Sequence, residues 1–358
     1  MLYLIVYIWG ILLGELVIES RKFIFLVNAD ERIGGGHLRR SLNLADELAL
    51  SVPKRNIIFL HWSFDSAFAS LIINYNSTTI DKDELINHLK GVVSLADRDL
   101  LIVDSDDLEI HSLTYQHLFR RIGVETAYFT VNSEIKYECD ILINPSILAL
   151  YQKYKTSPEV KCLFGPNYFI FGEQFRRIQK QPVHKKVDTI FINFGSADPM
   201  GYTLEVLKFF IQNRNFDRFK LKVVLGSMNH ELDQVRTLVV GYEDRIEVLF
   251  DTSDMYQVMS DCQLAICSPG TTFWELTVLG IRSVILSSAQ REKESAILLD
   301  KLGYANLLLH CDQDFTDKTL QNLGGWLKDM TSIAPNLSRL QELINPNGLK
   351  GIVQEILE

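Results

Sequence analysis

A glycine-rich turn that ends in a histidine is the segment of this chain best suited to chemistry. The turn, Ile33 to His37, follows the apolar run Phe23 to Val27 and precedes apolar residues at helical spacing from Leu38 to Ala49. This order predicts a strand, a loop and a helix. Gly35 and Gly36 would let the backbone approach a ligand closely, and the free N–H groups at a helix N-terminus favour an anion.

His37 falls in the first turn of that predicted helix. Because the positive end of a helix disfavours imidazolium, we expect a neutral ring near pH 7 that can act as a general base. The alternative is a polar first-turn residue without a chemical role. Arg39 stands where a dinucleotide-binding G-x-G-x-x-G motif needs its third glycine. Nicotinamide chemistry is therefore disfavoured, and we expect no cofactor.

A second polar loop, Asp104 to Asp107, begins at the last residue of the largely apolar run Leu100 to Asp104. In open parallel sheets, ligands bind beyond the carboxyl ends of the strands, where both this loop and the glycine turn belong. Asp104 and Asp107 could position sugar hydroxyls or assist proton transfer. The alternative is a helix N-cap with solvated charges.

In the second half of the chain, Ser268 to Glu275 follows a buried run and opens a predicted helix. Gly270 and the hydroxyls of Thr271 and Thr272 could hold a diphosphate at the helix N-terminus. The Glu275 carboxylate could accept both hydroxyls of a ribose. The spacing from Thr272 to Glu275 is also that of a capping box, which needs no ligand. The spacing leaves both interpretations open.

Short β-rich runs alternate with helical stretches in two series, and these elements would position the loops. Such alternation is typical of doubly wound parallel sheets. The predicted strands are 22–28, 56–61, 100–104, 125–130 and 141–144 in the first series, and 189–194, 221–225, 246–250, 264–267, 283–286 and 305–309 in the second. The predicted divisions are an apolar extension 1–20, a first domain 21–170, a linker 171–187, a second domain 188–336 and C-terminal helices 337–358.

Composition narrows the class of protein. The chain has 358 residues, of which 47% are hydrophobic and 23% charged, and its formal net charge is −9. These values are ordinary for a two-domain globular enzyme and disfavour a nucleic-acid partner. Five cysteines without a C-x-x-C pair indicate reduced thiols in a cytoplasmic protein. The sequence has no zinc-type motif, so we expect no metal site.

The first 18 residues are apolar except for Glu15. A bilayer span usually needs about 20 apolar residues. Met1 to Gly14 is shorter and lacks the basic start of a secretory signal. Three interpretations compete: a non-native extension from an upstream start codon, a short membrane-surface anchor, and an additional packed helix or strand. We favour the extension over membrane contact through residues 1–14.

Several short motifs, taken in order, resemble one family. They are Ile33–Arg40, Cys139–Asn144, Gly165–Tyr168, Asp198-Pro199 and Gly270–Leu276. From about Lys22 onward the chain is similar in these motifs to the UDP-2,4-diacetamido-2,4,6-trideoxy-β-L-altropyranose hydrolases of pseudaminic acid biosynthesis and to related spore-coat polysaccharide proteins. Its second half also looks like nucleotide-sugar glycosyltransferases with two Rossmann domains.

The resemblance implies an α/β protein with two Rossmann-like doubly wound domains that face each other across a cleft, as in the GT-B fold. It also implies that the second domain holds UDP, that the first receives the sugar, that His37 activates water, and that no metal is required. The complete predicted site has His37 as the catalytic residue, a substrate side with Gly35, Gly36, Arg40, Asp104, Asp107, Asn144 and Tyr168, and a UDP side with Gly195, Ser196, Phe250, Gly270, Thr271, Thr272 and Glu275.

Departures from the family pattern lie mainly on the sugar side. The usual paired aspartates after a later strand of the first domain become Thr130-Val131, and the usual L-R-x-E-F becomes Phe171–Phe175 without its arginine. Our first hypothesis is a cytoplasmic hydrolase that releases UDP from a modified deoxy-amino sugar by inverting attack of water at the anomeric carbon. The alternatives are a glycosyltransferase with a sugar or lipid-linked acceptor and a non-catalytic nucleotide-sugar-binding protein. The oligomeric state is left open.

Overall fold

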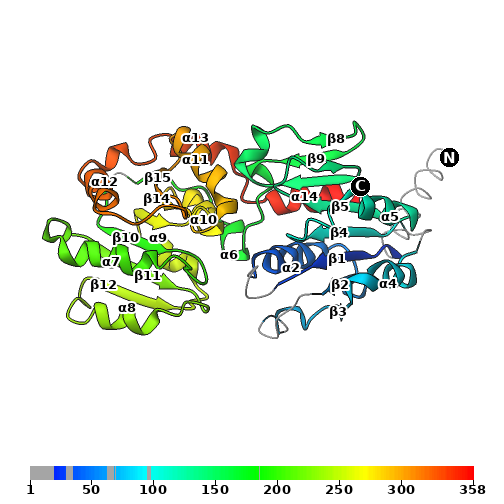
Figure 1. Ribbon diagram of the computed structural model, residues 1–358, viewed down its shortest axis with the longest axis horizontal. Helices are drawn as coiled ribbons and strands as arrows, with labels where there is room; N and C mark the ends of the chain where they lie inside the picture. Colours follow the sequence, from blue (N-terminus) through cyan, green and yellow to red (C-terminus); the bar gives the residue numbers. More distant parts are fainter. Residues whose placement is uncertain (1–19, 30–34, 63–67, 69, 95–97, 185) are drawn as a thin grey trace, which may run out of the picture. The chain divides into compact units, whose positions relative to one another are not determined.

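The computed structural model describes residues 20–29, 35–62, 68, 70–94, 98–184 and 186–358 (Figure 1). The apolar segment 1–18 and Gly34 lie outside the described residues. The chain divides into two compact units. The first unit runs to Ile170 and also includes Asn347–Glu358, and the second unit is Phe171–Pro346.

The first unit is built on a seven-stranded parallel sheet, as far as the structure describes it, in the order β3-β2-β1-β4-β5-β7-β9. The strands are β1 (Phe23–Val27), β2 (Ile57–His61), β3 (Asn76–Thr79), β4 (Leu100–Asp104), β5 (Glu125–Phe129), β7 (Ile141–Asn144) and β9 (Lys161–Phe164). A separate parallel pair joins β6 (Lys136–Tyr137) to β8 (Lys155–Thr156). The helices are α2 (Gly36–Leu48), α4 (Leu85–Val92), α5 (Leu113–Arg121) and α14 (Gly348–Leu357).

Helices cover both faces of this sheet because side chains alternate along each strand. In β1, Phe23 and Phe25 pack in the core that includes α2 and α14, whereas Ile24 and Leu26 pack in the core that includes α4 and α5. A strand that is buried on both faces has a continuous run of apolar residues, and such a run is why β1 could be predicted from the sequence.

The second unit repeats this architecture with the strand order β12-β11-β10-β13-β14-β15, again all parallel in the described part of the chain. Its strands are β10 (Thr189–Asn193), β11 (Lys220–Leu225), β12 (Ile246–Phe250), β13 (Leu264–Cys267), β14 (Arg282–Leu286) and β15 (Asn306–Leu309). Its helices are α6 (Glu173–Arg176), α7 (Tyr202–Gln212), α8 (Leu232–Leu238), α9 (Met255–Ser260), α10 (Thr271–Val278), α11 (Lys293–Lys301), α12 (Asp317–Lys328) and α13 (Leu337–Leu343).

Each sheet has a switch point where the strand order reverses, between β1 and β4 in the first unit and between β10 and β13 in the second. Loops that leave the carboxyl ends of two such strands turn to opposite faces and leave a crevice for ligands. The polar loops singled out in the sequence follow these four strands. The fold therefore brings them together in pairs, one pair in each unit.

Two predicted divisions differ from the structure. The sequence predicts one group of C-terminal helices over residues 337–358. In the structure, α13 belongs to the second unit and α14 to the first. Helix α14, drawn in red beside the strands of the first unit in Figure 1, contacts α2, and the Arg21 Nη1 atom donates to the Ile356 carbonyl over 2.8 Å. The segment predicted as a linker also packs within the second unit, where Phe171 is fully buried.

Candidate active site

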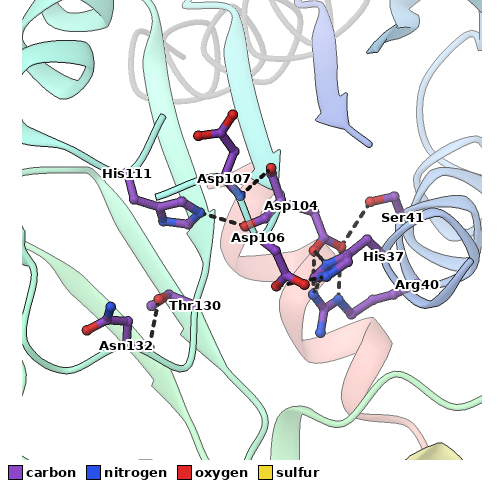
Figure 2. A network of polar contacts seen from close by, with 10 residues as sticks. His37, Arg40, Ser41, Asp104, Asp106, Asp107, His111, Thr130 and Asn132 are labelled. Carbon is purple, nitrogen blue, oxygen red and sulfur yellow. Dashed lines mark hydrogen bonds and ion pairs between the residues drawn. The ribbon is translucent and has the colours of Figure 1, made fainter. Parts of the chain in front are cut away.

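His37 and Asp104 are brought together by the pairing of β1 with β4. Asp104 is the last residue of β4, and His37 lies in the first turn of α2, as predicted. The His37 Nδ1 atom is 2.6 Å from Asp104 Oδ1, which is within hydrogen-bond distance (Figure 2). The side chain of His37 is 17% exposed and that of Asp104 is completely buried. An inner carboxylate thus fixes the orientation of the ring.

Asp104 is held from several sides. Arg40 Nε donates to Asp104 Oδ2 over 2.9 Å, the Arg40 Nη2 atom contacts Oδ1, and Ser41 Oγ donates to Oδ2 over 3.1 Å. The Arg40 guanidinium also stacks over the ring of Phe129, 4.7 Å from its centroid. Although burial disfavours the charged form, the charges of Arg40 and His37 hold the pKa of Asp104 well below its usual range. Asp104 is therefore an ionised buried carboxylate with its oxygens satisfied.

A second carboxylate reaches the other nitrogen of the ring. Asp106 Oδ1 lies 3.1 Å from His37 Nε2, and the Asp106 side chain is 45% exposed. Asp104 and Asp107 were predicted as site residues from the sequence, but Asp106 was not. The acidic run was the available signal, and only the path of the loop shows which of its aspartates faces His37.

The charge state of His37 differs from the prediction. Burial lowers its pKa, but the charge of Asp104 and hydrogen bonds to Asp104 and Asp106 outweigh burial and raise the pKa to about 9. The expected neutral ring was inferred from the helix N-terminus alone, a partial charge of about half a unit. Two full carboxylate charges at contact distance dominate it. In this structure, the favoured form at pH 7 is imidazolium, with both nitrogens as donors.

Gly35 and Gly36 differ in what surrounds them. A side chain at Gly35 would come within 2.8 Å of the Phe68 ring, whereas one at Gly36 would meet nothing within 4 Å. A side chain at Gly35 would therefore require the Phe68 ring to shift, and Gly36 leaves open space beside His37.

The remaining substrate-side residues serve local structure. Asp107 pairs with Lys82 over 2.6 Å and points away from His37 (Figure 2). The amide of Asn144 is buried between the Tyr154 hydroxyl and the Ser146 backbone N–H. Tyr168 packs against the core beneath α14. Of the predicted substrate-side side chains, the structure gathers Arg40 and Asp104 around His37 and directs these three elsewhere.

In the second unit, two predicted loops are joined through one buried amide. Asn193, the last residue of β10, has its Oδ1 atom 3.1 Å from the Gly195 backbone nitrogen and 3.3 Å from Thr272 Oγ1. Gly195 has φ of 82°, a conformation that favours glycine. Asn193 was not predicted as a site residue, because in the sequence it falls within the predicted strand 189–194. The Gly195 loop and the start of α10 therefore lie side by side.

The other UDP-side residues lie at the carboxyl edge of this sheet. Gly270 is the N-cap of α10 without any side-chain cap, and Thr271 is exposed. Ser196 is also exposed. Phe250 ends β12 and is 42% exposed. The N-terminus of α10 thus presents uncapped backbone N–H groups, which suit an anion.

Glu275 does not form the capping box that the sequence left open. The cap of α10 is Gly270, so Thr272 is already inside the helix. Among the described residues, the Glu275 carboxylate receives no hydrogen bond and forms no ion pair. Burial accordingly raises its pKa to about 8. A half-buried carboxylate without donors is the arrangement that ligand hydroxyls would satisfy.

The described residues also bear on metal binding and on membrane insertion. Within the described residues, no group of three or more histidine, cysteine or acidic side chains could hold a metal ion. In the same part of the chain, no helix is long and apolar enough to cross a membrane.

Comparison with known proteins adds relatives by sequence. No family model matches the chain. An uncharacterized protein, MJ1062 of Methanocaldococcus jannaschii, is 27% identical over 288 residues, which cover 76% of this chain and only 57% of that protein. The UDP-2,4-diacetamido-2,4,6-trideoxy-beta-L-altropyranose hydrolase of Campylobacter jejuni is 23% identical over 79% of this chain and 97% of its own length. Bacillus subtilis SpsG, a spore coat polysaccharide biosynthesis protein, is 23% identical over 74% of this chain and 76% of its own length.

Solved structures show the fold. Acinetobacter baumannii MurG has a TM-score of 0.66 at 15% identity, with 94% of this chain and 99% of MurG covered. Phytolacca americana UGT2, solved with UDP-2fluoro-glucose and pterostilbene, has a TM-score of 0.62 at 12% identity and the same coverage. The chain has the GT-B fold class. The predicted α/β class with two Rossmann-like domains is confirmed, and the relatives confirm the resemblance to the hydrolase and spore-coat family.

Proposed function

We propose that this protein is a UDP-sugar hydrolase of surface-polysaccharide synthesis. The observation that carries the proposal is the His37–Asp104 pair at the switch point of the first unit, 2.6 Å apart and anchored by Arg40. A histidine oriented through Nδ1 leaves Nε2 as the atom that can take a proton from a nucleophile. Similarity to the Campylobacter hydrolase supports the choice of water as that nucleophile.

In the proposed reaction, neutral His37 accepts a proton at Nε2 from a water molecule. The water oxygen attacks the anomeric carbon, and the bond from that carbon to the diphosphate oxygen breaks with inversion. UDP leaves with the bonding pair. The buried, ionised Asp104 stabilises the imidazolium that forms, and Arg40 keeps Asp104 ionised.

The second unit supplies the proposed UDP site. The uncapped start of α10 at Gly270 and the hydroxyls of Thr271 and Thr272 would hold the diphosphate. Glu275, which lacks hydrogen-bond donors within the described part of the protein, would accept the ribose hydroxyls. No step in this scheme calls for a metal.

A glycosyltransferase is the second candidate, and one observation favours it. Loops after β5 and β7 expose apolar side chains at the sheet edge where β4 ends: Val131 is 60% exposed, Leu150 47% and Tyr151 56%. Exposed apolar surface of this kind suits an acceptor with an apolar part better than it suits water.

The deciding experiment incubates the protein with UDP-sugars, alone and with sugar or lipid-linked acceptors, and measures free UDP and the sugar product. A hydrolase releases UDP and free sugar without an acceptor, and the sugar has the inverted anomeric configuration. Release that requires an acceptor would establish the transferase instead. UDP-sugar binding without any release would leave a binding protein.

A further inference from the structure

The two carboxylates on His37 differ in a way that the proposed reaction does not use. Asp104 is fully buried and holds Nδ1, whereas Asp106 is 45% exposed and holds Nε2 at 3.1 Å. Figure 2 shows the ring between them, with Asp106 on the side away from Ser41. The inner contact is supported by Arg40 and Ser41. The outer contact is the one that solvent reaches.

Nε2 is the nitrogen that must meet the nucleophile, since Nδ1 is committed to Asp104. A nucleophile oxygen must approach a general base to about 2.6–3.2 Å. The Asp106 oxygen already occupies that position. We propose that Asp106 is a positioning residue that stands in for the nucleophile in the ligand-free protein and must turn away from His37 before the reaction can occur. This inference rests on the proposed function.

The backbone of the loop is held in place, so the movement is a rotation of one side chain. The Ser105 carbonyl accepts from His111 Nε2 over 2.8 Å, and Ser105 Oγ accepts from the Asp107 backbone N–H over 3.0 Å. Burial lowers the pKa of His111, which favours its neutral form. Its single proton then lies on Nε2, because a carbonyl can only accept, and Nδ1 lies 3.1 Å from the Tyr137 hydroxyl.

Asp106 adds to the charges that keep His37 protonated. These charges are Asp104 from β4, Asp106 from the following loop and Arg40 from α2 itself. Asp104 raises the pKa of His37 most, the hydrogen bond to Asp106 raises it further, and Arg40 lowers it by less. When Asp106 turns into solvent, the imidazolium loses that hydrogen bond, and His37 gives up its Nε2 proton to water more readily. Entry of the nucleophile and activation of the base are thereby coupled.

The test is the titration of His37 in the ligand-free protein, followed by NMR and assigned with His37→Asn. Asp106→Ala should lower the midpoint from about 9 by roughly one pH unit or more, the usual effect of a charged hydrogen-bond partner. Asp106→Asn should also lower it. Asp107→Asn is the matched control, because that neighbouring carboxylate pairs with Lys82 and should leave the midpoint in place.

Turnover provides the second measurement. The acidic limb of kcat/KM in Asp106→Ala should move to lower pH by the same amount as the NMR midpoint, with the high-pH plateau retained. An unchanged midpoint would overturn the inference. So would a shifted midpoint with a collapsed plateau, because Asp106 would then take part in the chemistry. If the unsubstituted protein releases no UDP from any sugar, the proposed function fails, and the NMR midpoint still decides the role of Asp106.

Discussion

The two units share a strand order but equip the same sheet edge in opposite ways. At the switch point of the first unit, His37, Arg40 and Asp104 satisfy one another before any ligand arrives. At the switch point of the second unit, the start of α10 has no side-chain cap and the Glu275 carboxylate has no donor within the described residues. One edge is internally saturated, and the other is the edge that we propose binds the nucleotide. The difference teaches that orienting a reactive group and binding a polar ligand place opposite demands on hydrogen bonding.

The strongest way to break the saturated edge is Asp104→Asn. Removing one partner from a buried ion pair typically costs about 3–5 kcal/mol, because the remaining charges are left uncompensated. The free energy of unfolding of the first unit should fall by about that amount, as measured by urea denaturation, and turnover should fall with it. Asp83→Asn, at an exposed site, should cost less than about 1 kcal/mol and serves as the control. A stable, active Asp104→Asn protein would contradict the saturated arrangement.

His37→Asn separates chemistry from binding. Turnover should fall by about 10²- to 10⁴-fold, as expected for loss of a general base. UDP affinity should change little, because the proposed nucleotide site lies in the other unit. In the unsubstituted protein, the acidic limb of kcat/KM should lie near pH 9, where neutral His37 becomes the main form. A limb near pH 6.5 would mean that His37 is not the titrating base.

The saturated edge should also make stability depend on pH. His37 has a folded-state pKa of about 9, above the ordinary 6.5, so its stabilising contribution is complete below pH 6.5 and is lost as the pH rises through 9. The loss should amount to roughly 3 kcal/mol at most. Thermal unfolding from pH 6 to 10 measures it, and His37→Asn should flatten the profile over that interval. An equally steep profile in this variant would assign the effect to other groups.

Glu275→Gln tests the unsaturated edge. UDP binding should weaken by about 1.5–3 kcal/mol, the range for hydrogen bonds to a charged group, as measured by calorimetry above pH 8. Stability should not fall, because no bond of the folded protein is lost. Burial raises the pKa of Glu275 from 4.5 to about 8, so the stability of the unsubstituted protein should fall as the pH rises from 4.5 to 8, a loss that the uncharged amide variant would not show. Unchanged UDP affinity would exclude a role in ribose binding.

The smallest effect is expected from a chain that begins at Glu19. The proposed site draws on elements from Arg21 onward, so turnover of a soluble UDP-sugar should be retained. Assays in solution and with liposomes should agree between the short and full chains. Activity lost only on membrane-bound substrate would favour the membrane-surface anchor and the transferase.

Sequence pattern was sufficient for the architecture because parallel strands buried on both faces read as apolar runs. It failed for β3, whose residues Asn76–Thr79 are polar and exposed, and which pairs with β2 through its backbone. Pattern also could not place α14, because an apolar helical face does not say which core it covers. The fold class, the position of His37 in its helix and a helix that opens within Ser268–Glu275 could all be predicted.

What the sequence alone determined is therefore which residue types stand at the carboxyl ends of the strands. Only the tertiary structure decided how they are paired. Three aspartates lie close together in the sequence, yet Asp104 and Asp106 meet His37 while Asp107 meets Lys82. A pKa responds to charges within a few ångströms, and those charges come from another strand. The sequence could predict a helix dipole acting on His37, but not the two carboxylates that outweigh it.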